Sequence, residues 1–382
     1  MKINILFVYR GPFNKGGMEN VMINICKYID KELFHIDFLI LDKAEDNSSE
    51  KKYLETLGCK FYAITSRKDD FLLHINELDD FFNSHQYDIV HTHMDAIGDE
   101  ALRIARKHNV RIRIAHSHNT DFVLVNNTGI IGFFHKKYMI LEKYLLRYYA
   151  NYYIACSTEA GEWLFGRKIC HGPNYLMLNN FIELNNFIYD ENIRKVMRSE
   201  LHVENKKVII HVGQFRKQKN HQMILKIFKL LHQRDNNYHL ILVGDGSERN
   251  SIENYIRDNE LEETVSMLGA RDDVNKLLQA ADIFLFPSLF EGFGNALLEA
   301  QVSDLPCIIS ENIPTDAIVI EKVKTINLNE TPEFWADCLE KLLSESKQRK
   351  NRIQDFIERG FDERTQIKKL EDFYKNAFES NQ

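Results

Sequence analysis

The chain has 382 residues, of which 44% are hydrophobic and 27% are charged, and its formal net charge is −7. This composition argues against disordered, collagen-like and disulfide-scaffold proteins, and the length suits two or three domains. The acidic balance gives no overall sign of nucleic-acid binding. The six cysteines contain no C-x-x-C pair, which disfavours a zinc knuckle and favours a reducing compartment.

Segments typical of strands and helices alternate along the first half of the chain. Strands are predicted at 3–9, 35–41, 60–64, 87–93, 111–116 and 152–157, with amphipathic helices between most of them. Several of these strands are continuous apolar runs, as strands covered on both faces are. The pattern therefore predicts an α/β protein with a doubly wound parallel sheet.

The pattern changes at the polar, helix-like segment 185–205, and then the alternation restarts. Strands are predicted at 207–213, 238–244, 265–269, 283–287 and 306–310, with helices at 220–234, 247–259, 272–280 and 295–303. The tail from about residue 331 has helical patterning. We expect two similar domains, an N-terminal one over 1–184 and a C-terminal one over 185–361.

The N-terminus gives no targeting signal. Residues 1–9 are typical of a strand and lack the apolar region and cleavage site of a signal peptide. No apolar stretch reaches the ~18–20 residues that span a bilayer. We therefore expect a cytoplasmic protein, either free or peripheral at the inner face of the cell membrane.

Polar and glycine-rich groups follow the strands of the first half. Gly16 and Gly17 stand where a helix begins, and backbone N–H groups there favour phosphate, although a plain glycine turn explains them equally well. His91-Thr92-His93 ends one strand and His116-Ser117-His118 ends the next, so both pairs are expected at the rim of a ligand cleft. Three interpretations stay open: satisfied polar strand ends, a histidine that contacts substrate, and a less favoured four-histidine metal site.

Residues 101–150 carry a local charge of +7, from nine basic and two acidic residues. Aromatic and leucine residues lie among the cations over 133–149. A basic aromatic helix suits an anionic membrane surface, and a solvated basic face with an ordinary core stripe is the equal alternative. RNA binding is the weaker third option because no RNA-binding motif accompanies the charge.

The second half of the chain contains two further turns whose residues could bind a ligand. Gly213 ends a strand and is followed by Arg216 and Lys219, cations that suit a diphosphate. The strongest pattern is an apolar strand that runs into Glu291-Gly292-Phe293-Gly294-Asn295 and then a helix with Glu299. Amides at that helix start suit an anion, and carboxylates bind the diols of sugars or ribose.

Taken together, these motifs resemble those of the family 4 retaining glycosyltransferases of GT-B fold, of the bacterial exopolysaccharide and capsule type. The resemblance covers nearly the whole chain. The residues that carry it are Gly16-Gly17-Met18-Glu19, His116-Ser117-His118-Asn119, Cys156-Ser157, Gly213 with Lys219-Asn220, Gly244-Asp245-Gly246, and the pair Glu291 and Glu299, which matches the family's E-x7-E motif. The family implies two Rossmann-like domains facing a central cleft, with a C-terminal helix, here 362–382, that crosses back to the first domain.

The resemblance also implies roles for individual residues. Glu299 would hold the donor ribose and Glu291 would face the donor sugar, while Phe293, Gly294 and Asn295 would offer backbone contacts to sugar and phosphate. Lys219 would bind the diphosphate, joined by Gly16 and Gly17. His116, with His118, would lie near the transferred sugar. Catalysis is thus expected from Glu291, His116 and His118, without a metal or other cofactor.

Two positions depart from the family pattern. The family usually has Arg directly after the glycine of the 213 motif, where this chain has Gln214, and Arg216 is the candidate replacement for that charge. At the domain junction the family's N-G-I-D corresponds to Asn180-Phe181-Ile182-Glu183. The first departure leaves the phosphate-binding cation open, and the second predicts an altered turn.

The resemblance implies transfer of a sugar from a nucleotide donor, by family habit a UDP-sugar, to a glycan or polyprenyl-linked acceptor. No nucleic-acid partner is expected. A UDP-sugar epimerase and a non-catalytic subunit of the same fold are the alternatives. The donor sugar, the acceptor and the oligomeric state are not given by the sequence.

Overall fold

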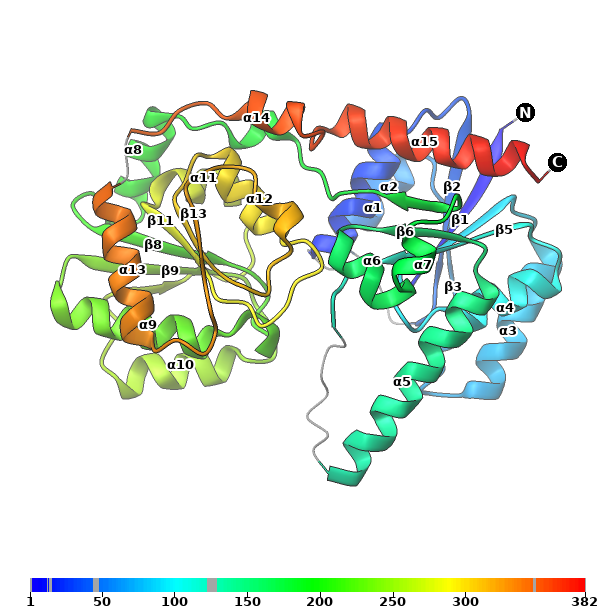
Figure 1. Cartoon of the computed structure of the whole chain (residues 1–382), viewed down its shortest axis with the longest axis horizontal. Coiled ribbons are helices and arrows are strands. Elements are labelled where there is room, and N and C mark those ends of the chain that lie inside the picture. The colour runs from blue at the N-terminus through cyan, green and yellow to red at the C-terminus, as the bar shows by residue number, and fades with distance from the viewer. Residues whose placement is uncertain are drawn as a thin grey trace. The chain divides into compact units, whose positions relative to one another are not determined.

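The computed structural model describes residues 2–11, 13, 16–43, 48–121, 129–345 and 348–381. The chain divides into two compact units, one formed by Met1–Asn180 with Glu363–Gln382 and the other by Phe181–Asp362. Each unit is an α/β domain built on its own parallel sheet (Figure 1). The first unit ends slightly before the boundary that we expected after residue 184.

The first unit has a seven-stranded parallel sheet with the order β3-β2-β1-β4-β5-β6-β7. Its strands are β1 (Ile3–Tyr9), β2 (Phe34–Ile40), β3 (Phe61–Ala63), β4 (Ile89–Thr92), β5 (Ile112–Ser117), β6 (Tyr152–Ala155) and β7 (Tyr175–Met177). The six predicted strands are confirmed to within a few residues. The sequence did not predict β7, whose three residues are only half-buried.

Helices connect these strands and cover the sheet. They are α1 (Gly17–Tyr28), α2 (Ser49–Thr56), α3 (Phe71–Ser84), α4 (Asp99–Lys107), α5 (Gly129–Tyr149), α6 (Thr158–Phe165) and α7 (Arg167–Cys170). The C-terminal helix α15 (Glu363–Glu379) also belongs to this unit and packs beside α1 (Figure 1). No described helix is both long enough and apolar enough to span a bilayer.

The second unit has a six-stranded parallel sheet with the order β10-β9-β8-β11-β12-β13. Its strands are β8 (Lys207–Val212), β9 (Tyr238–Val243), β10 (Val265–Met267), β11 (Ile283–Phe286), β12 (Cys307–Ser310) and β13 (Val323–Ile326). Its helical segments are η1 (Leu184–Phe187), α8 (Glu191–Glu200), η2 (Lys217–Lys219), α9 (His221–Arg234), α10 (Arg249–Asp258), α11 (Val274–Ala280), α12 (Asn295–Val302), η3 (Thr315–Ala317), α13 (Pro332–Glu345) and α14 (Ile353–Glu358). The sequence missed only β13 among these strands.

The strand orders indicate where a ligand site is expected in each sheet. The direction of winding reverses between β1 and β4 in the first unit and between β8 and β11 in the second. In open α/β sheets, ligands lie outside the carboxyl ends of the strands at such a reversal. The predicted glycine, histidine and glutamate motifs follow β1, β4, β11 and the neighbouring strand β5, so the fold collects them at these two edges.

Candidate active site

In the second unit, the loop after β8 is tied to the loop after β11. The backbone N–H of Leu289 donates to the carbonyl of Gln218 (2.8 Å), and Gln218 Nε2 donates to the carbonyl of Phe290 (3.0 Å). Asn220 Nδ2 donates to the carbonyl of Pro287 (3.1 Å). These contacts form because β8 and β11 are neighbours in the sheet. They hold the two predicted donor-binding loops in one frame.

Lys219 and Glu291 form an ion pair inside this frame. Lys219 Nζ lies 2.7 Å from Glu291 Oε1, and the two side chains are only 16% and 7% exposed. The same ammonium lies 4.8 Å from the centre of the Phe286 ring. Limited contact with water strengthens the electrostatic attraction between the two charges of such a pair. The structure therefore brings together two residues that the sequence singled out separately.

A glycine starts the helix that follows this loop. Gly294 is the N-cap of α12 and has φ of 92°, a left-handed conformation that glycine adopts without steric cost. The first backbone N–H groups of α12 lack intrahelical partners, as at any helix start, and Asn295 begins the helix. Phe293 is buried with its ring 5.7 Å from that of Phe361, so only its backbone is available to a ligand.

Glu299 lies one turn inside α12 and is half-buried. Burial raises its pKa to about 8. Its carboxyl group has no hydrogen-bond partner within the described part of the chain. A carboxyl group that is removed from water without a partner is unfavourable, and a ligand with hydroxyl donors would satisfy it.

The turn after β9 supports the site through its backbone. A Cβ atom on Gly244 would lie 2.1 Å from the carbonyl oxygen of Gly213, so the two turns touch directly. Gly244 also has φ of 141°. The Gly244-Asp245-Gly246 turn is therefore structural.

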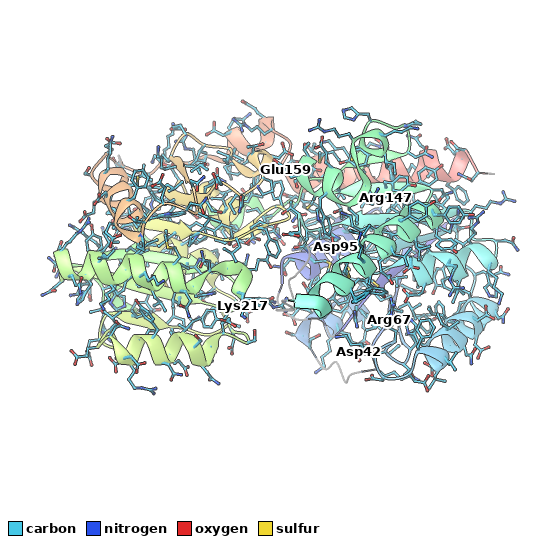
Figure 2. All side chains as sticks on the ribbon, turned by 60° about the horizontal axis from the view of Figure 1, so that its bottom comes forward. Asp42, Arg67, Asp95, Arg147, Glu159 and Lys217 are labelled. Atoms are coloured by element: carbon cyan, nitrogen blue, oxygen red, sulfur yellow. The ribbon has the colours of Figure 1, made fainter. Side chains whose placement is uncertain are left out.

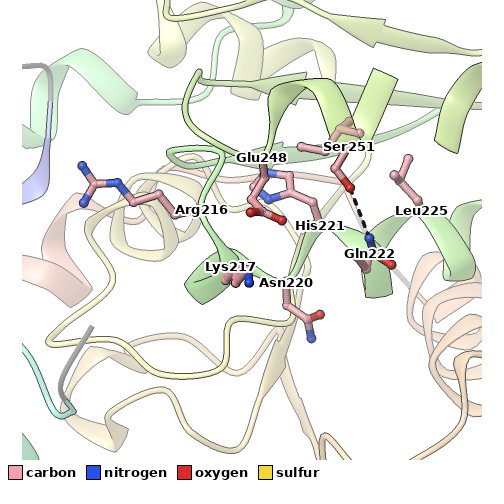
Figure 3. Close-up of a pocket in the computed structure, with 9 residues that line it drawn as sticks. Arg216, Lys217, Asn220, His221, Gln222, Leu225, Glu248 and Ser251 are labelled. Atoms are coloured by element: carbon pink, nitrogen blue, oxygen red, sulfur yellow. Dashed lines mark hydrogen bonds between the residues drawn. The ribbon is translucent and has the colours of Figure 1, made fainter. Parts of the chain in front are cut away.

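Arg216 does not share the environment of Lys219. It is exposed and lines a pocket of about 290 Å³ together with Lys217, His221, Glu248 and others. Figure 3 shows the Arg216 side chain extending away from Glu248 and His221. Neither Lys219 nor Glu291 lines this pocket. The geometry thus favours Lys219, rather than Arg216, as the cation beside Glu291.

In the first unit, the four predicted histidines form two hydrogen-bonded pairs. His91 Nε2 lies 3.1 Å from His116 Nδ1, and His93 Nδ1 lies 3.0 Å from His118 Nε2. All four rings are at most 8% exposed. The four rings are therefore buried at the carboxyl ends of β4 and β5, and their place at the rim of a ligand cleft stays a prediction.

The burial decides the charge of these rings. It lowers the pKa of all four imidazoles, with further lowering from neighbouring imidazoles for His91, His93 and His116. The pKa of His118 falls to about 3. Nitrogen atoms of His91, His93 and His116 lie within 4.8 Å of one another, a spacing that suits a metal ion. Both nitrogens of His91 are already hydrogen-bonded, however, so a metal would have to displace a bond.

Asp95 is a site residue that sequence reasoning missed (Figure 2). It has φ of 49°, and its Oδ1 accepts hydrogen bonds from the backbone N–H groups of His118 (2.6 Å) and Asn119 (3.2 Å). Its Oδ2 accepts from Asn119 Nδ2 (2.6 Å). Asp95 thus fixes the loop after β5. The available signal was its position two residues after His93 at a strand end.

The glycine turn after β1 is only partly described, because Pro12, Asn14 and Lys15 lie outside the described residues. Gly16 is the N-cap of α1, which begins at Gly17. A Cβ atom on Gly16 would lie 2.3 Å from Glu19 Oε2. Glu19 is buried and accepts a hydrogen bond from the Tyr9 hydroxyl. The absence of a side chain at Gly16 therefore makes room for this carboxylate.

Two family profiles match the chain, and each covers most of one unit. The profile described as Glycosyltransferase Family 4 matches residues 15–174, and the profile described as Glycosyl transferases group 1 matches residues 192–359.

Three relatives match nearly end to end. EpsF of Bacillus subtilis, named as a glycosyltransferase, is 27% identical over 381 residues, which are 99% of this chain and 97% of EpsF. A UDP-Gal:alpha-D-GlcNAc-diphosphoundecaprenol alpha-1,3-galactosyltransferase of Escherichia coli is 25% identical over 98% of this chain and 97% of its own. The capsular polysaccharide biosynthesis glycosyltransferase CapH of Staphylococcus aureus is 24% identical over 90% and 92%.

Among solved structures, HepE of Anabaena in complex with UDP-glucose matches with a TM-score of 0.75 and 19% identity, covering 98% of this chain and 100% of HepE. The fold and the two profiles define a GT-B glycosyltransferase. The chain belongs to glycosyltransferase family 4, and it is therefore a glycosyltransferase. The resemblance, the fold class and the enzyme class expected from the sequence are thus confirmed.

Proposed function

We propose that this enzyme transfers a hexose from a UDP-sugar to a lipid-linked glycan acceptor, with retention of the anomeric configuration and without a resident metal ion. The observation that carries the proposal is the Lys219–Glu291 pair held beside the N-terminus of α12. The names of the relatives support the substrates, because the Escherichia coli relative is named for UDP-Gal and a diphosphoundecaprenol acceptor and HepE was crystallised with UDP-glucose.

The donor follows from the chemistry of these groups. The half-buried carboxyl group of Glu299 accepts hydrogen bonds from the ribose hydroxyls. Lys219 and the first N–H groups of α12, at Gly294 and Asn295, balance the diphosphate charge that grows as the sugar leaves. These donors from the protein itself perform the task that a metal ion performs in other transferases. In the first unit, the backbone N–H groups of Gly16 and Gly17 at the start of α1 are also proposed to bind phosphate.

Retention is proposed from the family resemblance, and the described residues around Lys219 and α12 offer no free carboxylate for a double displacement through an enzyme nucleophile. Glu291 is paired with Lys219, and Glu299 is assigned to the ribose. We therefore assign a displacement on the same face of the sugar, assisted by the leaving phosphate. His116 and His118 would hold the transferred sugar through hydrogen bonds from neutral imidazoles.

Calorimetric titration with UDP, GDP and ADP, each with and without EDTA, tests the donor site. We expect selective UDP binding that EDTA does not change and that Glu299→Ala weakens by about tenfold, since two lost hydrogen bonds between neutral groups, at about 0.5–1.5 kcal/mol each, correspond to about 1–3 kcal/mol. Glu248→Ala is the matched control, because this carboxylate lies in the same unit at the other pocket. Equal binding of all three nucleotides, or a loss caused by EDTA, contradicts the proposal.

The reaction itself is tested with UDP-hexoses and a diphosphoundecaprenol-linked sugar. We expect an α-configured product from an α-configured donor, which nuclear magnetic resonance of the anomeric proton measures. Conversion of the donor without acceptor identifies an epimerase instead. UDP binding without turnover on any acceptor identifies a non-catalytic subunit.

The surface of α5 supports the lipid-linked acceptor. Large apolar and aromatic side chains are exposed along this helix, and the N-terminal half of α5 extends away from the rest of its unit (Figure 1). These residues are Phe134, Tyr138, Ile140, Leu141, Tyr144 and Tyr148. Such a face, with exposed Lys137 on it, suits the interface of an anionic membrane, where lipid-linked acceptors are found.

The opposite side of α5 anchors the helix to its unit. Glu142 is buried and pairs with Arg67 at 3.3 Å. Lys143 lies 4.2 Å from the centre of the Trp163 ring, and burial lowers its pKa to about 8. Arg147 donates to the carbonyl of Leu164. Several cations counted in the sequence therefore bind protein, so the membrane-facing surface is chiefly aromatic.

Vesicle co-sedimentation tests this surface. We expect binding to phosphatidylglycerol vesicles and weaker binding to phosphatidylcholine. Leu141→Ser and Tyr144→Ser are each expected to reduce binding by about tenfold, because each removes one large apolar side chain from the interface. Leu72→Ser is the control, since Leu72 is 74% exposed on α3 of the same unit. An equal loss in all three variants contradicts the role of α5.

A further inference from the structure

A buried chain of hydrogen bonds joins the C-terminal helix to His116. The hydroxyl of Tyr374, on α15, lies 2.7 Å from His91 Nδ1. His91 Nε2 in turn lies 3.1 Å from His116 Nδ1. The three side chains are at most 1% exposed, and His116 Nε2 has no hydrogen-bond partner among the described residues. This chain of hydrogen bonds reaches His116 at its Nδ1 atom, so Tyr374 and His91 can determine which of its ring nitrogens carries the proton.

The chemistry of the three groups sets the direction of this chain. Burial keeps the Tyr374 hydroxyl protonated by raising its pKa, and it keeps both imidazoles neutral by lowering theirs. A phenol is a better donor than an imidazole N–H, and an imidazole nitrogen is a better acceptor than a phenol oxygen. If the hydroxyl accepted instead, its own proton would be buried without an acceptor among the described residues.

Each proton position then follows from the one before. Tyr374 donates to His91 Nδ1, so the neutral His91 ring carries its proton on Nε2. His91 therefore donates to His116 Nδ1, and His116 carries its own proton on Nε2. The second pair gives no such direction, because neither His93 nor His118 bonds through its ring to a further described side chain that fixes a proton.

We propose that Tyr374 and His91 are positioning residues that hold His116 in the Nε2–H tautomer, so that His116 acts on the transferred sugar as a hydrogen-bond donor and not as a base. The functional part of this inference rests on the proposed function, whereas the tautomer does not. The buried Nε2–H group has no acceptor among the described residues, and a sugar hydroxyl oxygen has the right chemistry to supply one.

The tautomer is measured directly on the full chain labelled with 15N-histidine. Long-range 1H–15N spectra distinguish the nitrogen that carries the proton in each ring, and His116→Asn identifies the signals of His116. We expect the proton of His116 on Nε2 in the wild-type enzyme. A proton on Nδ1, or a doubly protonated ring at neutral pH, overturns the proposal.

Tyr374→Phe tests the origin of the effect. Without the hydroxyl, His91 is free to take either tautomer, so His116 should show both forms. If the two forms are equally populated, the donor KM rises about twofold and kcat changes little, because only half of the free enzyme is competent and the bound sugar draws His116 into the Nε2–H form. Tyr152→Phe is the matched control, since the Tyr152 hydroxyl accepts from Asn381 of the C-terminal segment and bonds no histidine.

The two proposals fail in different ways. Unchanged His116 signals in Tyr374→Phe, or the same change in Tyr152→Phe, overturn the relay. If the wild-type enzyme shows the Nε2–H tautomer but transfers no sugar with UDP-hexoses, the relay stands and the proposed function fails.

Discussion

The Lys219–Glu291 pair should be a measurable source of stability in the second unit. Lys219→Met leaves Glu291, which is 7% exposed, without its cation. Removal of one partner from a buried pair lowers the free energy of unfolding by about 3–5 kcal/mol. Because Lys219 is partly exposed, we expect a loss of about 3 kcal/mol for Lys219→Met. Glu291→Gln leaves the Lys219 ammonium unpaired, but this group can turn toward water. We therefore expect Glu291→Gln to lower the free energy of unfolding by only about 1–2 kcal/mol. The double variant should be more stable than the sum of the two losses implies, by about 1–2 kcal/mol.

The assay is equilibrium unfolding in urea, followed by tryptophan fluorescence. The chain has two tryptophans, Trp163 in the first unit and the fully buried Trp335 in the second. A Trp163→Phe background therefore reports on the second unit alone. The control is the exposed pair of Lys207 and Asp235, whose side chains are 48% and 30% exposed. Its removal should cost much less than removal of the Lys219–Glu291 pair, because water screens exposed charges.

Strict additivity of Lys219→Met and Glu291→Gln would refute this reasoning, because a pair in contact must show coupling. A loss as small as that of the Lys207 control would also refute it. Lys219→Arg supplies a second check. It keeps the charge and should retain most of the stability. Its turnover of UDP-sugar then shows whether the reaction needs a lysine at this position or only a positive charge.

Three further predictions concern single carboxylates. The folded-state pKa of Glu299 is raised to about 8, so the unfolded chain binds fewer protons between about pH 4.5 and 8; stability should fall by at most about 5 kcal/mol as pH rises through that window, and thermal unfolding of Glu299→Gln should show less of this fall. Asp304 is fully buried and lies 2.7 Å from both Lys322 Nζ and Arg352 Nε, so Asp304→Asn should lower the free energy of unfolding by about 3–5 kcal/mol in urea. Asp95→Ala releases the loop that carries His118, so kcat should fall about tenfold or more with UDP affinity unchanged by calorimetry, and Asp95→Asn should recover part of it.

Most of the fold was predictable because its strands are long, apolar and separated by amphipathic helices. The two missed strands lack that signal. All three residues of β7 are half-buried, and β13 is an edge strand in which Lys324 and Thr325 are exposed. Parallel edge strands of this kind show neither a continuous apolar run nor a clear alternation, so periodicity does not detect them.

The candidate residues of the site could be predicted from the sequence, whereas the contacts between them could not. Lys219 and Glu291 are 72 residues apart, and they meet because β8 and β11 are neighbours in the sheet. Tyr374 and His91 are 283 residues apart, and their contact depends on the packing of α15 in the first unit. Local patterns contain no information on such pairs. The burial of the four histidines was missed for the same reason, since it depends on elements distant in sequence.

The pairing also bears on the departure at Gln214. Arg216 is exposed in another pocket, so Lys219 supplies the positive charge beside the start of α12. Glu291 already neutralises this charge. A diphosphate that binds there must compete with Glu291 for the ammonium. If Lys219 turns to the phosphate, as the proposed function requires, Glu291 loses this cation at the proposed position of the donor sugar. An anion in that position stabilises the positive charge that develops on the sugar as the diphosphate leaves. We therefore expect Glu291→Gln to lower kcat more than it weakens UDP binding, because the carboxylate acts only after Lys219 has been released.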